Sequence, residues 1–377
     1  MDPFEYHKKN RGKVAIKSKV EIKTREDLSL AYTPGVAEVS MAIHKDKNKI
    51  WDYTSRWNTI AVVSDGSAVL GLGNIGAEAA LPVMEGKAIL FKELGDVDAF
   101  PLCLRTQEVD EIINIIENIA PTFGGINLED VSAPRCFEIV ERIEQSDIDI
   151  PIFHDDQDGA AIVTTAALEN ACKVLGREMK DLRIAISGAG AAGIATARLL
   201  SKDVKDIFLV DSKGIVNKSR DDLNLYKQQM LQITNKENRS GSLADAMKKT
   251  DVFIGVSAPN IVSKEMVKSM NKDPIIFAMA NPIPEIMPDE AKAAGAAIVG
   301  TGRSDFPNQI NNSLVFPGLF RGTLDARARR ITKEMKLSAV HALANYMKPE
   351  AEKILPDPLD REIPKIIAEA VKKAARK

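Results

Sequence analysis

The sequence predicts an α/β fold in two domains, an N-terminal α/β domain followed by a doubly wound parallel sheet. Its 377 residues exceed the usual size of a single domain and contain enough apolar side chains for two cores. From Ala160 onward, helical and strand patterns alternate, and the strand segments are short, continuous apolar runs. Such runs are typical of parallel strands covered by helices on both faces. We place the boundary so that residues 1–157 form the first domain and residues 158–377 the second.

The bulk composition excludes several classes of function. A formal net charge of −2 indicates no basic surface for nucleic acid or an anionic membrane. The three cysteines are far apart and odd in number, which argues against a disulfide framework or a paired-cysteine metal site. No stretch has the pattern of a signal segment or the length of a membrane span. We therefore expect a cytoplasmic protein that acts on a small molecule, with no nucleic-acid or membrane partner.

One tyrosine stands out in the N-terminal part of the chain. Residues 1–30 are basic and polar, and Thr24 is expected to cap a short helix there. Pro34 disfavours helix just before it and Gly35 permits a turn, so Tyr32 lies on a bend. A ring that packs at a domain edge is the simpler interpretation of these residues taken alone.

Lys87 points along the buried face of a predicted helix, residues 77–94. The helix follows a predicted strand at residues 59–64 and a glycine-rich turn at residues 71–76, which gives the helix room to approach the sheet. The neighbours of the lysine one turn away are all apolar: Val83, Met84, Leu90 and Phe91. Such a lysine commonly extends to an edge of the helix. Alternatively it stays in a pocket where desolvation lowers its pKa, which suits a general base.

Two groups of carboxylates follow predicted strands. Glu129 and Asp130 stand at the end of one strand, and Asp155, Asp156 and Asp158 lie between the next strand and a helix. An acidic turn that caps the following helix is the simpler interpretation of the second group. Because strand ends converge in α/β folds, a site with oxygen ligands for a hard cation explains both groups. The expected ion is Mg²⁺ or Mn²⁺ rather than zinc.

A glycine-rich turn in the second half has the full context of a dinucleotide-binding site. A strand at residues 182–187 precedes it, a helix at residues 191–200 follows, and Asp211 ends the next strand. The turn itself consists of Gly188, Ala189, Gly190, Ala191, Ala192 and Gly193. Its glycines permit a tight turn and close approach of a pyrophosphate to the helix N-terminus. This predicts a Rossmann nucleotide-binding domain. Asp211 favours the ribose hydroxyls of NAD and Lys213 the 2′-phosphate of NADP, so the choice between the two stays open.

Two asparagines follow the later strands of this domain. Those strands are predicted at residues 252–256, 275–279 and 297–300. Asn281 stands at the end of the second of them, and Asn312 lies in a polar loop further on. Taken singly, each asparagine favours a role in a turn, although its amide would also suit a ligand. Helices at residues 325–347 and 363–376 are expected to complete the chain.

Together, these stretches resemble the malic enzyme family in its short prokaryotic form. The resemblance runs from about Asp27 to about Arg330 and covers most of the chain. Each marker alone is weak, but their order and spacing are highly specific. The markers are residues 31–36, 64–66, 71–76, 86–87, 129–130, 153–156, 280–282, 311–312 and 316–318.

By this resemblance the chain is expected to decarboxylate malate oxidatively to pyruvate and carbon dioxide. It would use NAD or NADP with Mg²⁺ or Mn²⁺, and it would assemble as a homo-oligomer, a dimer or tetramer. The first domain would then hold substrate and metal. The matched positions are Tyr32 and Lys87 as the catalytic pair, Asp155 as the acid that accompanies the lysine, Glu129, Asp130 and Asp156 as metal ligands, and Asn281 and Asn312 at the nicotinamide and substrate.

The chain also departs from the family's pattern. Larger eukaryotic members have an arginine that binds a malate carboxylate where this chain has Ala68. Residues 158–160 read Asp-Gly-Ala where relatives often have His-Gly-Thr or Gln-Gly-Thr, so Asp158 adds a negative charge near the expected metal. Two alternatives remain open at this point. One is a malolactic enzyme, which retains its nucleotide and yields lactate, and the other is a non-catalytic nucleotide-sensing protein.

Overall fold

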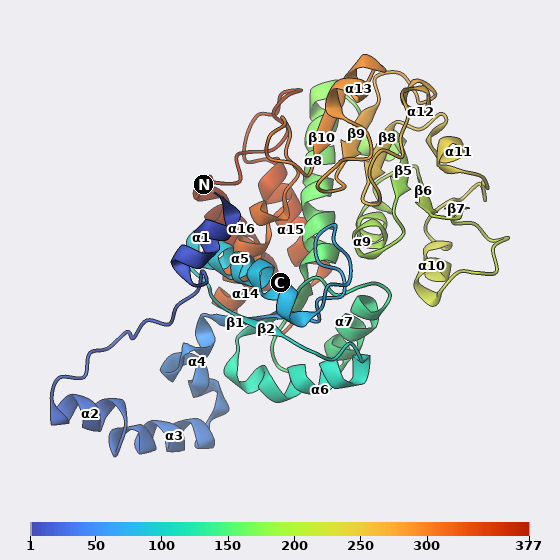
Figure 1. The fold of residues 1–377 in the computed structure, drawn as a ribbon. Helices are drawn as coiled ribbons and strands as arrows, with labels where there is room; N and C mark the ends of the chain where they lie inside the picture. The colour runs from blue at the N-terminus through green and yellow to red at the C-terminus, as the bar shows by residue number, and fades with distance from the viewer. Residues whose placement is uncertain (1, 377) are drawn as a thin grey trace.

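The computed structural model describes residues 2–376, which form two mostly parallel sheets with helices around them (Figure 1). The first sheet has four strands in the order β2-β1-β3-β4, and all of its pairings are parallel. Parallel strands present their carboxyl ends at the same edge of the sheet, where α/β folds bind their ligands. The strands are β1 (Thr59–Ser64), β2 (Asp98–Cys103), β3 (Gly125–Leu128) and β4 (Ile152–His154).

Helices from both ends of the chain cover the first sheet. Those that connect its strands are α5 (Ala77–Gly95), α6 (Val109–Ile119) and α7 (Arg135–Gln145). The C-terminal helix α14 (Phe316–Asp325) packs on α5, where the ring of Phe91 lies 4.6 Å from that of Phe316. Helix α16 (Glu362–Ala375) packs in turn on α14 and on α15 (Lys333–Ala344). The C-terminal helices therefore join the first sheet to the rest of the molecule.

The second sheet has six strands in the order β10-β9-β8-β5-β6-β7. Its strands are β5 (Arg183–Ser187), β6 (Asp206–Asp211), β7 (Gly214–Ile215), β8 (Val252–Gly255), β9 (Ile275–Ala278) and β10 (Ile298–Thr301). All pairings are parallel except that of β7 with β6. The chain leaves β5 first in one direction and then in the other, which makes the sheet doubly wound. Its helices are α8 (Ala160–Leu175), α9 (Ala191–Leu200), α10 (Leu225–Met230), α11 (Leu243–Met247), α12 (Lys264–Lys268) and α13 (Pro288–Ala293).

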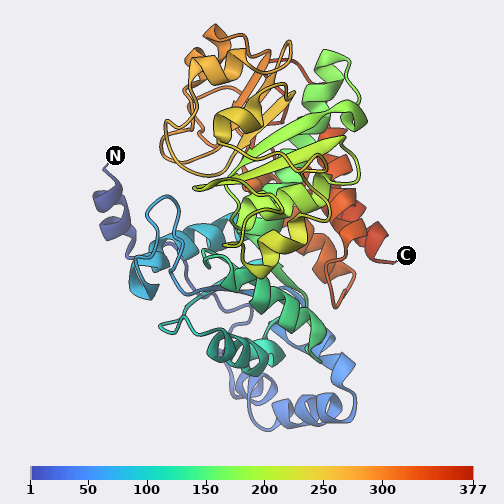
Figure 2. The same ribbon diagram turned by 90° about the vertical axis from the view of Figure 1, so that its right-hand side faces the viewer.

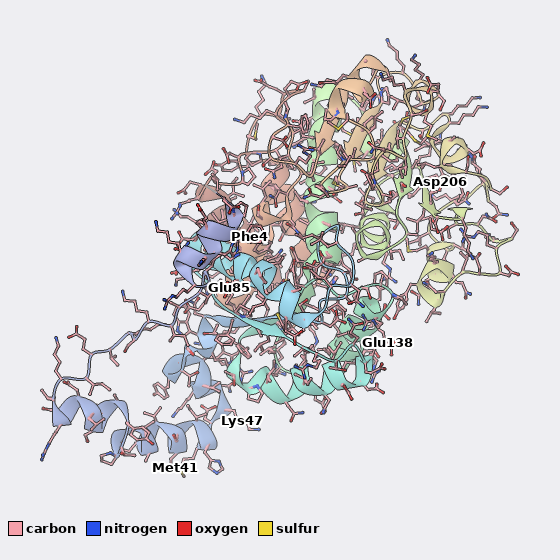
Figure 3. The ribbon with its side chains drawn as sticks, in the orientation of Figure 1. Phe4, Met41, Lys47, Glu85, Glu138 and Asp206 are labelled. Carbon is pink, nitrogen blue, oxygen red and sulfur yellow. The ribbon has the colours of Figure 1, made fainter. Side chains whose placement is uncertain are left out.

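The N-terminal segment is divided between the body of the molecule and an arm. Helix α1 (Pro3–Asn10) lies beside α5, whereas α2 (Arg25–Ala31) and α3 (Gly35–Lys45) project away from both sheets (Figures 1 and 2). We call residues 14–45 the N-terminal arm. Neither α2 nor α3 has a buried residue. Met41 on α3 lies far out on this arm, well away from the body of the molecule (Figure 3).

The predicted fold class is confirmed, and several elements begin and end where the sequence places them. Strand β1 and helix α9 have the predicted bounds, and Thr24 caps α2 through a capping box with Asp27. No helix within residues 2–376 combines the length and apolar character needed to cross a bilayer.

Two predictions of local structure were wrong or missing. The single helix predicted for residues 325–347 is wrong, because α14 ends at Asp325 and α15 begins only at Lys333. Arg327 adopts a left-handed φ of 48° and the side chain of Thr332 caps α15, so the chain turns between them. Strand β2 was not predicted. It contains Pro101, which a strand accommodates at the edge of a sheet, where β2 lies.

Candidate active site

Three carboxylates meet at the carboxyl edge of the first sheet. Glu129 and Asp130 follow β3, and Asp156 follows β4, the neighbouring parallel strand. One oxygen from each residue lies within 4.8 Å of the other two. The backbone N–H of Asp130 donates to Oδ2 of Asp156 at 2.8 Å, which ties the two strand ends together. Parallel register therefore produces the cluster that the sequence predicts.

The electrostatics of this cluster fit a divalent cation. Burial raises the pKa of Asp130 to about 8, and repulsion from Asp156 and Glu129 adds to the effect. Burial also raises the pKa of Asp156 to about 6, despite the nearby Lys87. Oδ2 of Asp130 is buried and has no hydrogen-bond partner among the described residues. An unpartnered carboxylate oxygen beside two further carboxylates suits a hard cation with oxygen ligands.

Lys87 is buried and paired rather than extended to an edge. It is 8% exposed, and its Nζ lies 2.6 Å from Asp155 Oδ2 and 2.8 Å from Glu129 Oε1. The ammonium also stands 4.2 Å from the centre of the Phe316 ring on α14. Burial alone would lower the pKa of Lys87, but the ion pairs with Asp155 and Glu129 outweigh it and raise the pKa. Of the two alternatives that the sequence left open, the buried position is the one observed, but the lowered pKa that was expected with it is wrong.

A five-residue π-helical turn, Asp155–Gly159, directs its three acids toward three different elements. Asp155 Oδ2 accepts from Lys87 on α5 and, at 2.6 Å, from Nδ2 of Asn312. Asp156 faces β3, as described above. Asp158 pairs with Lys336 of α15 at 2.6 Å, so its charge is neutralised on the side away from the carboxylate cluster. That ion pair accounts for the residue that departs from the family's pattern.

These groups line a single cavity of about 660 Å³. Lys87, Asn312, Ala68 and the three carboxylates all contribute to its wall. His7 and Lys13 line it as well, although the sequence analysis singled out neither. Both precede the first recognisable pattern in the sequence, and only tertiary packing brings them here.

A glycine contact joins the turn beside the cavity, whose Leu70 lines it, to the second sheet. A Cβ atom at Gly71 would overlap the backbone oxygen of Asn281, so the glycine-rich turn before α5 approaches the loop that follows β9. Asn281 is exposed at this junction. Of the two predicted asparagines, the structure therefore places Asn312 in the cavity and Asn281 at its border with the nucleotide-binding sheet.

Tyr32 is not part of this cavity. It ends helix α2 on the N-terminal arm, where 64% of its surface is exposed. The arm projects away from both sheets and from α5, the helix that carries Lys87 (Figures 1 and 2). Within one chain, the structure brings together every predicted catalytic and metal residue except the tyrosine.

The glycine-rich turn after β5 has the shape that a pyrophosphate requires. Gly188 has a φ of 110°, which favours glycine, and a Cβ atom at Gly193 would overlap the oxygen of Gly188. At Gly190, by contrast, an added Cβ atom would meet open space. The turn leads directly into α9, whose N-terminus has no side-chain cap, so its backbone N–H groups remain available to an anion.

Asp211 ends β6 within a cluster of opposite charges. Both oxygens of its carboxylate pair with Arg220, at 2.8 and 3.1 Å, and Lys227 approaches to 2.6 Å. Burial opposes ionisation, but these hydrogen bonds outweigh it and lower the pKa of Asp211 to about 2. Lys213 instead pairs with Asp222 at 2.9 Å and is largely exposed.

Comparison with known proteins assigns the family. Residues 9–144 match the family model "Malic enzyme, N-terminal domain", and residues 157–376 match "Malic enzyme, NAD binding domain". The chain belongs to the malic enzyme family. It is accordingly an NAD(P)-dependent oxidoreductase with a Rossmann nucleotide-binding domain, which confirms the resemblance read from the sequence.

Individual members of the malic enzyme family match nearly the whole chain. The bifunctional malic/malolactic enzyme of Bacillus subtilis is 54% identical over 99% of this chain and 92% of its own length. The NAD-dependent malic enzyme of Geobacillus stearothermophilus is 52% identical over 97% of this chain and 77% of its own. The crystal structure of the NAD-dependent malic enzyme of Thermotoga maritima superimposes with a TM-score of 0.95 at 50% identity, covering 99% of both chains.

Proposed function

We propose that this malic enzyme oxidises malate with NAD(P)⁺ and a divalent cation, giving pyruvate, carbon dioxide and NAD(P)H. The observation that carries the proposal is the pairing of buried Lys87 with Asp155 beside three carboxylates, at the border of the nucleotide-binding sheet. A lysine next to a cation site suits removal of the proton from a 2-hydroxy acid as it is oxidised. A non-catalytic nucleotide sensor would have no use for this arrangement.

The residues of the cavity divide the proton transfers between them. Nζ of Lys87 accepts the proton of the C2 hydroxyl after the ammonium has released its own proton to solvent, and Asn312 holds the Asp155 oxygen that pairs with the lysine. When bound, the nucleotide takes up the hydride, and the cation polarises the C2 oxygen and stabilises the negative charge that develops as carbon dioxide departs. Glu129, Asp130 and Asp156 would hold that cation. A tyrosine hydroxyl then returns a proton to C3.

We further propose that the tyrosine comes from a second copy of the chain. The arm exposes Tyr32 together with other apolar side chains, and α2 and α3 bury nothing within their own chain. The exposed side chains are Leu28, Leu30, Tyr32, Val36, Val39 and Met41. Exposed apolar side chains gathered on one segment favour an interface, and a two-fold dimer would exchange the two arms symmetrically. Each cavity would then receive the tyrosine that its own chain does not provide.

An assay with both cofactors tests the proposed reaction. Malate, Mn²⁺ and either NAD⁺ or NADP⁺ are expected to give a steady increase in absorbance of the reduced nicotinamide, with pyruvate as product. Lactate is measured in parallel, since the Bacillus subtilis relative is named for both activities. Lactate without accumulation of reduced nucleotide would replace the proposal with the malolactic reaction. Nucleotide binding without any turnover of malate would exclude both the oxidative decarboxylation and the malolactic reaction.

Replacing Asp156 with alanine is expected to raise the Mn²⁺ concentration needed for half-maximal activity by about tenfold or more. The number of charged ligands sets the affinity of a hard-cation site, and the cluster would lose one of three. Asp158→Asn is the matched control, because Asp158 lies two positions away but pairs with Lys336. An Mn²⁺ titration that is the same for Asp156→Ala and the parent protein would remove Asp156 from the ligands.

Replacing Asp211 with alanine is expected to shift preference toward NADP by about tenfold or more in kcat/KM. The change removes the acceptor for the ribose hydroxyls and frees Arg220 and Lys227 to meet a 2′-phosphate. Asp222→Ala removes a charge from the same cluster without removing that acceptor, so its shift should be smaller. A preference that moves toward NAD in Asp211→Ala would contradict this assignment.

A further inference from the structure

The cavity lacks an obvious cation for the second charge of its proposed substrate. Malate has two carboxylates, and Ala68 contributes no charge to the cavity wall. Lys87 is already paired with Asp155 and Glu129. Three carboxylates in the same wall carry one more negative charge than a single divalent cation would balance, so the wall would still repel a dianion. A further basic group must therefore face the cavity if it is to bind a dicarboxylate.

Lys13 is such a group. Its Nζ donates to the backbone oxygen of Pro82 at 2.6 Å and lies 3.2 Å from Nε2 of His7. An ammonium has three N–H bonds and no acceptor, so His7 accepts at Nε2 and donates from Nδ1 to the oxygen of Pro3, 2.9 Å away. No carboxylate lies within salt-bridge distance of Lys13 in residues 2–376. One N–H bond and the full charge of the ammonium remain available.

The backbone around Lys13 is fixed against helix α5. Its own N–H donates to Oε2 of Glu85 at 3.1 Å, and a Cβ atom at the preceding Gly12 would stand 3.0 Å from the other oxygen of that carboxylate. Gly12 has a φ of 99°, so this close approach requires glycine. Figure 3 labels Glu85 on α5. The loop that holds Lys13 is thus fixed in the cavity wall by its contacts with α5.

The ammonium stands beside the residue that precedes Lys87. A Cβ atom at Gly86 would lie 3.6 Å from Nζ of Lys13, so the absence of a side chain there leaves room for the ammonium over α5. Lys13, Ala68 and Lys87 all line the same cavity. The free charge therefore lies on the substrate side of the helix that carries the proposed base.

We propose that Lys13 binds a carboxylate of the substrate. The inference rests on the proposed oxidation of a dicarboxylate, and it assigns one recognition element of that site to the segment before the N-terminal arm. Lys13 selects dicarboxylates over monocarboxylates, because its charge-assisted hydrogen bond has no partner in a substrate with a single carboxylate.

The test compares Lys13→Met with the parent protein in two measurements. The KM for malate is expected to rise by about 10- to 100-fold, the effect of losing a hydrogen bond between charged groups, with the KM for nucleotide unchanged. Calorimetry then gives the affinities of hydroxymalonate, a dicarboxylate, and glycolate, its monocarboxylate counterpart, in the presence of Mn²⁺. The ratio of the affinity for hydroxymalonate to the affinity for glycolate should fall by the same factor as the KM for malate rises. Lys13→Arg should recover much of both losses.

Controls separate recognition from a role in folding and from the reaction itself. Lys17→Met removes an exposed lysine four positions away and should change neither measurement. If Lys13 only ties α1 to α5, Lys13→Met would lower thermal stability while the hydroxymalonate preference stayed unchanged, and the proposal would be overturned. If the parent protein binds hydroxymalonate in preference to glycolate but does not oxidise malate, the proposed reaction fails while the assignment of Lys13 is still decided by the binding data.

Discussion

Replacing Lys87 with alanine is expected to lower kcat by about 10²- to 10⁴-fold, the usual contribution of a general base. The loss should appear with either cofactor, because the nucleotide site on β5 and α9 is separate from α5. Nucleotide binding, measured by calorimetry, should remain. The same change leaves Asp155 and Glu129 buried without their cation. We therefore also expect it to cost about 3–5 kcal/mol of stability, as for other broken buried ion pairs.

Lys87→Arg separates the two effects. Arginine keeps the positive charge between the two carboxylates, so most of the lost stability should return. It cannot serve as a base, because its guanidinium does not deprotonate in proteins. Activity should therefore stay as low as in the alanine variant. A Lys87→Arg protein with near-normal turnover would exclude Lys87 as the base and leave it only a structural role.

Mixing two inactive variants is expected to restore activity if the second copy supplies the tyrosine. Tyr32→Phe retains the lysine and Lys87→Arg retains the tyrosine, and each alone should be nearly inactive. In a mixed dimer, one of the two cavities receives an intact tyrosine from one chain and an intact lysine from the other. Random exchange makes half of the dimers mixed, so about a quarter of the parent activity should return.

The outcome of mixing distinguishes this arrangement from an arm that folds back on its own cavity. In that case neither cavity of a mixed dimer has both groups, and no activity would return. Exchange of chains is verified with two affinity tags purified in sequence. Tyr53→Phe is the matched control for the first variant, because Tyr53 is also an exposed tyrosine near the arm and should remain active.

The sequence predicts best what local pattern determines. Continuous apolar runs located β1 and β5, and the fingerprint around Gly188 identified the nucleotide fold from about thirty residues. The carboxylates were predictable because strands of a parallel sheet end at one edge, so Glu129 and Asp156 meet despite their separation in the chain.

What the sequence could not show depends on contacts between distant segments. Lys87 has a raised pKa, the opposite of the shift expected for a lysine buried among apolar side chains, because carboxylates that follow β3 and β4 pair with it. Asp158 has its partner on α15, and Lys13 reaches the cavity only because Gly12 bends the chain against α5. No periodic pattern in the sequence indicates any of these contacts. For Tyr32, the sequence indicated the residue but not that its own chain would leave it exposed.

The π-helical turn Asp155–Gly159 makes the length of this stretch as critical to the protein as its side chains. Its three acids contact three separate elements, and a Cβ atom at Gly159 would overlap Asp155 Oδ1. Inserting or deleting one residue would rotate every later side chain by about 100° around the helix axis. The base's partner, the cation ligand and the link to α15 would then all point the wrong way at once. A substitution in this turn therefore affects one of the three contacts, whereas a single-codon gap would affect all three in one step.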